Sequence, residues 1–366
     1  MNIKSLLIGS AAALVAVSGA RAADAVVAEP EAVEYVRVCD AYGAGFFYIP
    51  GTETCLKIGG YVRYDIGIGD RNGEDTDGDG DGDAFYKNAR LSLQISTAAD
   101  TELGTLRTYA ETRFNYGTTR TVVDGGSGVD GIAGNADDPA DTFFYADGGA
   151  NRGVSLNFAY IELGGLRVGK DESVFTTFAG YAGSVINDGI VPYGPFDTTL
   201  ISYTFTGGNG FSAIISLEDD NATGDGYVPD VVVGAKYAAG DFGITGVVGY
   251  DESTSEFGGK LRVDATLGAF SVFVMGGYGT DDTFATSRFK PWGGNYAIWA
   301  GASYTVNDKI GLNMEVDYDE NKNFGIAGNV VYTVAPGFKV TTEVSYDDGA
   351  GRNGNFGGVM RFQRSF

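Results

Sequence analysis

Two stretches of the sequence carry residue types that could bind a ligand. The run Gly73–Asp83, GEDTDGDGDGD, is dense in carboxylates, and Asp75, Asp77 and Asp79 match the opening of a calcium-binding EF-hand loop. The twelfth position of such a loop is Tyr86 here rather than glutamate, and the pattern shows no flanking helices. We therefore expect a solvated, self-repelling loop, with weak divalent-cation binding as the alternative, and no dedicated metal site.

The second stretch, GGLRVGK at Gly164–Lys170, has the G-x-x-x-x-G-K spacing of a phosphate-binding loop. Asp171 follows it where serine or threonine is required, and the stretch alternates like a strand instead of turning into a helix. We expect no nucleotide binding.

The chain has two cysteines, Cys39 and Cys55, and no histidine. Their surroundings lack the paired spacing of a zinc site, so we predict a structural disulfide between them. Such a disulfide closes a loop of about 15 residues and stabilises the fold by about 3 kcal/mol in the chain-entropy model. Without histidine, Ser-His-Asp triads, Cys-His pairs and His-ligated zinc are excluded. Carboxylate-only catalysis remains possible in principle, but no spacing singles out a pair. We predict that the protein is not an enzyme and uses no cofactor.

The first residues predict export. A cation at Lys4 precedes an apolar run, and small residues at Ala20 and Ala22 form an A-x-A cleavage site. We therefore expect a signal peptide at 1–22 and an N-terminal segment at 23–55 that carries the disulfide. The net charge of −23 provides no basic surface for phosphates and argues against a nucleic-acid partner.

The elements that position the polar residues are predicted strands. The stretch CLKIGGYVRYDIGIG, beginning at Cys55, places apolar residues such as Leu56, Val62 and Ile66 on one face and Lys57, Arg63 and Asp65 on the other. Similar alternating segments of about ten residues recur to the end of the chain, and short turns alternate with long loops. Short turns at one end and long loops at the other are typical of an outer-membrane β-barrel, whereas a soluble β-sandwich is the alternative. We predict an all-β, antiparallel transmembrane barrel of about 16 strands over 56–366, wide enough for an aqueous channel.

Several stretches then resemble the alphaproteobacterial general-diffusion porins. They are VEYVRVCDAYGAGFFYIPGTETCLKIGGYVRYD at 33–65, YIELGGLRVGKDES at 160–173, ISYTFTGGNGFSA at 201–213, and the terminal MRFQRSF. The resemblance implies a homotrimer in the outer membrane of a Gram-negative bacterium, in contact with lipid and lipopolysaccharide. It implies that small hydrophilic solutes diffuse through each barrel and that a loop at 170–197 folds inward to narrow it. It also implies that Phe366 is read by the barrel-assembly machinery, although Arg364 stands where such signals usually have an apolar residue.

A channel of this kind needs charged walls at its narrowest point. Five arginines occupy the alternate strand positions that face the barrel interior. They form the predicted basic wall: Arg63, Arg90, Arg107, Arg113 and Arg361. We expect Asp171, Glu172 and Asp188 on the inward loop to oppose them. The alternative is that some arginines pair with Glu111 or Glu343 and only stabilise the wall.

The acidic outer run predicts weak cation selectivity, against the effect of the arginines. Two other functions remain open at this point: a surface barrel that serves adhesion through its long acidic loops, with little conductance, and a channel with a dedicated solute site.

Overall fold

The structure is a computed structural model that describes residues 37–74, 82, 84–123, 144–219, 227–280, 287–349 and 354–366. The chain divides into two units, Met1–Val38 and Cys39–Phe366, and every helix and strand given below lies in the second. The predicted signal peptide at 1–22 and the residues Asp75, Asp77 and Asp79 lie outside the described residues.

The second unit is almost entirely β-structure. In chain order its elements are the 3-10 helix η1 (Asp40–Tyr42), β1 (Phe47–Tyr48), β2 (Cys55–Ile68), α2 (Gly69–Asn72), β3 (Tyr86–Thr101), β4 (Gly104–Val123), β5 (Phe144–Leu163), β6 (Leu166–Glu172), α3 (Val174–Thr177), β7 (Asp197–Thr206), β8 (Phe211–Asp219), β9 (Asp230–Ala239), β10 (Phe242–Asp251), β11 (Glu256–Leu267), β12 (Phe270–Gly279), β13 (Tyr296–Asn307), β14 (Ile310–Asp319), β15 (Phe324–Ala335), β16 (Phe338–Asp348) and β17 (Asn355–Ser365). Among the described residues, no helix is long and apolar enough to cross a membrane.

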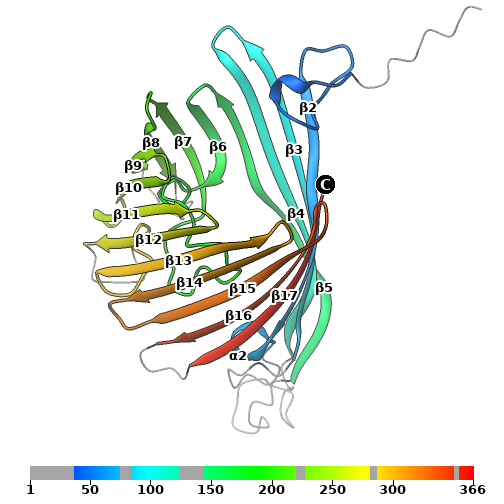
Figure 1. Cartoon of the computed structure of the whole chain (residues 1–366), viewed down its shortest axis with the longest axis vertical. Coiled ribbons are helices and arrows are strands. Elements are labelled where there is room, and N and C mark those ends of the chain that lie inside the picture. The colour runs from blue at the N-terminus through cyan, green and yellow to red at the C-terminus, as the bar shows by residue number, and fades with distance from the viewer. Residues whose placement is uncertain are drawn as a thin grey trace, which may run out of the picture. The chain divides into compact units, whose positions relative to one another are not determined.

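The strands form one closed antiparallel barrel (Figure 1). Of the 17 strands in the sheet, β1 is a two-residue strand that pairs with β2, and the other sixteen follow one another in chain order. The ring closes where β17 pairs with β2, so that Arg361 lies opposite Asp65 and Gln363 opposite Arg63. Closure leaves no unpaired sheet edge, as a membrane requires. The predicted sixteen-stranded barrel is confirmed.

The side chains alternate in the opposite sense to those of a soluble sandwich. On β14, Met314 is 48% exposed and Leu312 39% exposed on the outer face, whereas Glu315 and Asp317 point inward and are 1% and 0% exposed. Apolar residues thus face outward and carboxylates face inward. A soluble β-sandwich buries its apolar face instead, so this alternative is excluded.

The strand connections alternate in length as predicted. At one end they are tight turns such as Gly164–Gly165 between β5 and β6, Gly240–Asp241 between β9 and β10, and Gly268–Ala269 between β11 and β12. Gly240 and Gly268 have φ angles of 56° and 64°, in the left-handed region that two-residue hairpin turns use. The long connections join the strands at their opposite ends, where the connections at 252–255 and 320–323 have four residues each.

The facing of residues on β5 changes partway along the strand because of two irregularities in its pairing with β4. Glu111 pairs with Phe158 but the adjacent Thr112 pairs with Leu156, which leaves Asn157 as the extra residue of a β-bulge. A one-residue slip moves the following side chains to the other face. Simple alternation around Asn157 therefore cannot be read from the sequence.

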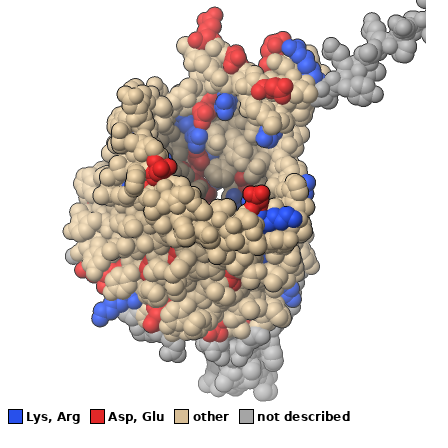
Figure 2. All heavy atoms as spheres, in the orientation of Figure 1, with Lys and Arg blue, Asp and Glu red and all other residues tan. Residues whose placement is uncertain are grey.

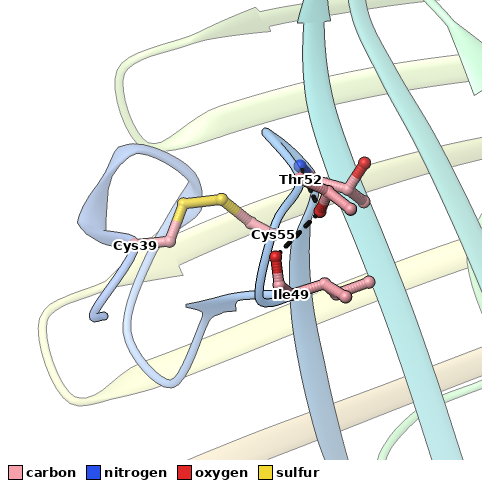
Figure 3. The surroundings of a disulfide bond; sticks show 5 residues. Cys39, Ile49, Thr52 and Cys55 are labelled. Carbon is pink, nitrogen blue, oxygen red and sulfur yellow. Dashed lines mark hydrogen bonds between the residues drawn. A yellow bond between two sulfur atoms is a disulfide. The ribbon is translucent and has the colours of Figure 1, made fainter. Parts of the chain in front are cut away.

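The predicted disulfide between Cys39 and Cys55 is confirmed (Figure 3). It joins the residue that precedes η1 to the first residue of β2, and both cysteines are almost fully buried. Between them the chain turns at Ile49, whose carbonyl accepts hydrogen bonds from the backbone N–H and the hydroxyl of Thr52 (Figure 3). We call residues 39–55 the N-terminal hairpin. It lies at the short-turn end of the barrel, because β2 starts there.

Candidate functional site

The loop between β6 and β7 folds into the barrel interior and begins with a short capped helix. The Ser173 hydroxyl accepts a hydrogen bond from the Phe175 backbone N–H and donates one of 2.6 Å to Glu218 on β8. Glu218 also accepts a 2.8 Å bond from the Val174 backbone N–H. The carboxylate of Glu218 is 1% exposed, so it binds the start of α3 to the inner wall away from water.

The middle of this loop is held by β15 and β16. The carboxylate of Glu343 accepts hydrogen bonds from the backbone N–H groups of Ile186 and Asn187 and from the Asn187 side chain, the latter two at 2.8 Å. The side-chain amide of Asn329 connects Glu343 and the Ser184 carbonyl, at 3.0 Å to each. Backbone groups that would otherwise lie unpaired inside the barrel are thereby satisfied.

The end of the loop is held by three more strands. The Val191 backbone N–H donates to Asp317 on β14 at 2.9 Å, and the Val191 carbonyl accepts from the indole of Trp299 on β13 at 2.8 Å. Lys260 on β11 donates to the Tyr193 carbonyl at 2.6 Å. The loop 173–196 is thus attached to one side of the interior, from β8 to β16.

Apolar packing reinforces the attachment. One buried cluster joins the loop side chains Val174, Phe175 and Tyr193 to wall residues such as Met275 and Trp299. Burying a large apolar side chain contributes about 1.5–3 kcal/mol. One side of the barrel interior is therefore packed like the core of a soluble protein.

The loop is shorter than the sequence predicted. It was expected to begin at residue 170, but β6 continues to Glu172, because Lys170, Asp171 and Glu172 pair with Thr199, Thr198 and Asp197 of β7. Asp171 and Glu172 are therefore strand residues, and only Asp188 of the three predicted acids lies on the loop itself.

Each of the three predicted acids has a specific partner. Asp171 is 5% exposed and forms an ion pair of 2.7 Å with Arg167, and Glu172 accepts a hydrogen bond from the Tyr181 hydroxyl. Asp188 accepts a 2.7 Å bond from the Tyr193 hydroxyl, and burial raises the pKa of Asp188 above its usual value of 3.8. Asp171 is thus neutralised by a cation, whereas Glu172 and Asp188 are bonded to neutral tyrosines.

The predicted basic wall lies on strands that the loop leaves uncovered. Arg63 on β2 pairs in register with Arg90 on β3, so the two arginines are side by side. Arg63 donates to Gln363 at 2.8 Å and Arg90 to Asn115 at 2.7 Å, and both partners are neutral amides. Neither of these two arginines forms an ion pair with a residue that the structure describes.

The other three predicted arginines differ from this pair. Arg113 forms an ion pair of 2.6 Å with Glu111, the partner that the alternative interpretation named, and Arg361 forms one of 2.8 Å with Asp65, which that interpretation did not name. Arg107 lies eight residues before Asn115 along β4. At a rise of about 3.3 Å per residue this is about 26 Å, so Arg107 does not belong to the same cluster.

Several wall residues that hold the loop were not predicted from the sequence, above all Glu218, Asp317 and Trp299. The inward facing of Asp317 could be predicted from the sequence, because this residue alternates with the apolar residues of β14. Parity shows that a side chain faces the interior but cannot show which segment of the chain it meets there.

Charged side chains gather around an opening that leads into the molecule (Figure 2). The described residues contain no cluster of three or more carboxylates, cysteines or histidines arranged to hold a metal ion. The terminal Phe366 is 59% exposed, and its backbone N–H and carbonyl bond to Gly60 of β2.

Comparisons with known proteins agree with this geometry. A family model described as the porin subfamily matches residues 24–360. The porin Omp2b of Brucella canis is 50% identical over 386 residues, and the porin Omp2a of Brucella suis is 49% identical over 381 residues, with 100% of each chain covered in both cases.

Two solved structures show the same fold at low identity. The outer membrane channel DcaP of Acinetobacter baumannii matches with a TM-score of 0.60 at 13% identity, covering 87% of this chain and 99% of that one. The anion-selective porin from Comamonas acidovorans matches with a TM-score of 0.53 at 13% identity, covering 86% and 100%.

Proposed function

Since the chain belongs to the porin subfamily and is an outer-membrane channel for diffusion, we propose that the loop 173–196 is the constriction of that channel. The observation that carries the proposal is the attachment of this loop to one side of the interior by Glu218, Asp317 and Glu343. Small hydrophilic solutes pass through the remaining space, between the loop and the wall of β2–β5 and β17.

The charges on the two sides of this space create a transverse field. Arg63 and Arg90 donate to neutral amides on one side, and Glu172 and Asp188 accept from tyrosine hydroxyls on the other. None of these four residues forms an ion pair with a residue that the structure describes. Fixed charges in a narrow water-filled passage orient dipolar solutes and set ion selectivity.

Replacing both arginines by glutamine, Arg63→Gln with Arg90→Gln, should shift the reversal potential under a salt gradient toward cation selectivity. The combined variant Arg361→Gln with Asp65→Asn is the matched control for position on the same wall. Because these two residues form an ion pair, replacing both leaves the net charge of the wall unchanged. Unchanged reversal potentials in the double variant would contradict the transverse field.

The test of the channel itself is single-channel recording from purified protein in a planar bilayer at several salt concentrations. We expect conductance steps that scale with bulk conductivity. Steps that saturate with salt would support a channel with a dedicated solute site, and folded, heat-modifiable protein without conductance would support the adhesion function.

We also propose the finer assignments that the family resemblance suggested. The protein assembles as a homotrimer, Phe366 is recognised by the barrel-assembly machinery, and the outer surface contacts lipid and lipopolysaccharide. The protein has no catalytic role. Conductance steps in groups of three, and a trimer mass from light scattering of detergent-solubilised protein, test the assembly.

A further inference from the structure

Besides the space between the loop 173–196 and the arginine pair Arg63 and Arg90, the barrel contains a charged cavity near its short-turn end. Its volume is about 410 Å³, and residues of β2–β6 and of the N-terminal hairpin line it. The residues that matter for its chemistry are Phe46, Lys57, Arg107, Tyr109, Tyr160 and Arg167.

The register of the strands explains why these residues meet. Tyr109 on β4 pairs with Tyr160 on β5 on one side and with Ser96 on β3 on the other. Ser96 in turn pairs with Lys57 on β2, so these four residues lie side by side across the sheet. Arg107 lies two residues along β4 from Tyr109, so the two side chains share the inward face.

The cavity contains a cation that the wall does not neutralise. Glu162 lies directly opposite Arg107 in register, but its carboxylate is bound by Arg167 at 2.8 Å. Arg167 in turn also pairs with Asp171. Arg107 is exposed and makes no hydrogen bond or ion pair with any residue that the structure describes. Its guanidinium therefore presents a full set of donors to the cavity.

The neighbouring surface of the cavity is aromatic. The Tyr109 and Tyr160 ring centroids are 5.5 Å apart, and the Arg167 guanidinium lies 4.4 Å from the centre of the Tyr160 ring. Lys57 donates to the Ala44 carbonyl of the N-terminal hairpin at 3.1 Å, so the hairpin closes this side of the cavity. A free guanidinium beside two tyrosine rings fits a ligand that combines a carboxylate with a planar ring.

We propose that this cavity is a binding subsite of the channel for small aromatic carboxylates. The carboxylate binds Arg107, with Lys57 as the second cation, and the ring packs on Tyr109 and Tyr160. The proposal does not depend on the constriction role of the loop 173–196. It requires only that the protein is an open channel.

The test uses planar-bilayer conductance in potassium chloride, with potassium benzoate added at constant ionic strength to each side in turn. Potassium acetate is the probe without a ring, and benzyl alcohol is the probe without a charge. We expect benzoate to reduce the conductance with a saturable dependence on its concentration. Acetate and benzyl alcohol should produce no saturable reduction of the conductance. Lack of saturation with benzoate would overturn the proposal.

The variant Arg107→Gln should raise the half-saturating benzoate concentration about tenfold or more, since a charge-assisted pair is lost. Lys236→Gln is the matched control, because Lys236 is an exposed cation on β9 with inward parity that does not line the cavity. An equal rise in the half-saturating benzoate concentration in the two variants would show that only the overall charge of the channel matters, which would overturn the assignment. An unchanged half-saturating concentration in Arg107→Gln would overturn it as well.

A second variant, Tyr160→Leu, tests the ring contact separately. It should weaken benzoate binding while leaving the small effect of acetate unchanged, and equal responses to the two anions would refute the aromatic contribution. Normal steps in potassium chloride alone, for each variant, show that the channel is intact. A failed subsite is thereby distinguished from a failed channel.

Discussion

Glu343 on β16 is the side chain whose loss should do most to free the loop 173–196. Its carboxylate is 1% exposed and accepts from two backbone N–H groups of the loop, those of Ile186 and Asn187, and from the Asn187 side chain. In the variant Glu343→Ala the two backbone N–H groups lose their acceptor while the loop stays in place. The loop can satisfy them only by moving toward water.

The size of the effect follows from the two backbone groups alone. An unsatisfied buried donor costs about 1–3 kcal/mol, so two of them cost about 2–6 kcal/mol. At 1.4 kcal/mol per tenfold change, even the lower bound shifts the equilibrium between attached and detached loop by about 30-fold. Other attachments, such as those at Glu218 and Asp317, remain, so we expect partial release of the middle of the loop instead of complete release.

Single-channel recording measures this release directly. Glu343→Ala should show a larger mean conductance and more current noise within the open state than the unmodified protein. Glu315→Ala is a close control, because Glu315 is also a buried carboxylate, two strands away on β14, but neither of its oxygens has a hydrogen-bond partner among the described residues. A double-mutant cycle with Asn187→Ala should show non-additive effects. If Glu343→Ala has the conductance and noise of the unmodified protein, the reasoning about the attachment is refuted.

Three further predictions concern other parts of the molecule. Replacing Cys39 and Cys55 by serine should destabilise the N-terminal hairpin by about 3 kcal/mol in the loop-entropy model while the barrel stays folded, which hydrogen exchange over 39–55 compared with the strands can measure. Glu315→Met should raise the temperature at which the barrel unfolds on gels, because an apolar side chain of similar size replaces a buried carboxyl group that no described donor satisfies, and a lower unfolding temperature would contradict this. Burial raises the pKa of Asp188, so this group takes up its proton at a higher pH than an unfolded aspartate and favours the folded state as pH falls. As pH falls toward and through 3.8, loss of its charge should shift the reversal potential toward anions before exposed aspartates titrate, and Asp188→Asn should remove this early shift.

The barrel and the inward facing of its charges could be predicted from the sequence because both follow from a local period of two residues. Arg63, Arg90 and Arg361 were placed on the interior face by alternation alone, and the register of β17, β2 and β3 brings them together. The disulfide was also predictable, since the chain has only Cys39 and Cys55.

The depth of each residue along the channel could not be predicted in the same way. Arg107 has the same parity as Arg113, but its place near the hairpin depends on how far each strand is displaced relative to its neighbours. The β-bulge at Asn157 adds a shift that alternation does not reveal. Likewise, the partners of the loop are far away in sequence, as with Asn187 and Glu343, and no local pattern connects them.

The packed side of the barrel has a consequence for how a cell controls what enters. With the loop 173–196 as the proposed constriction, its attachment by carboxylates, an indole and an apolar core at several points along its length keeps the bore of the pore nearly constant. Uptake through such a sieve then rises in proportion to the concentration difference across the membrane and to the number of copies present. The bacterium would adjust its permeability by how much of this protein it makes, through gene expression and turnover, instead of by opening and closing individual pores.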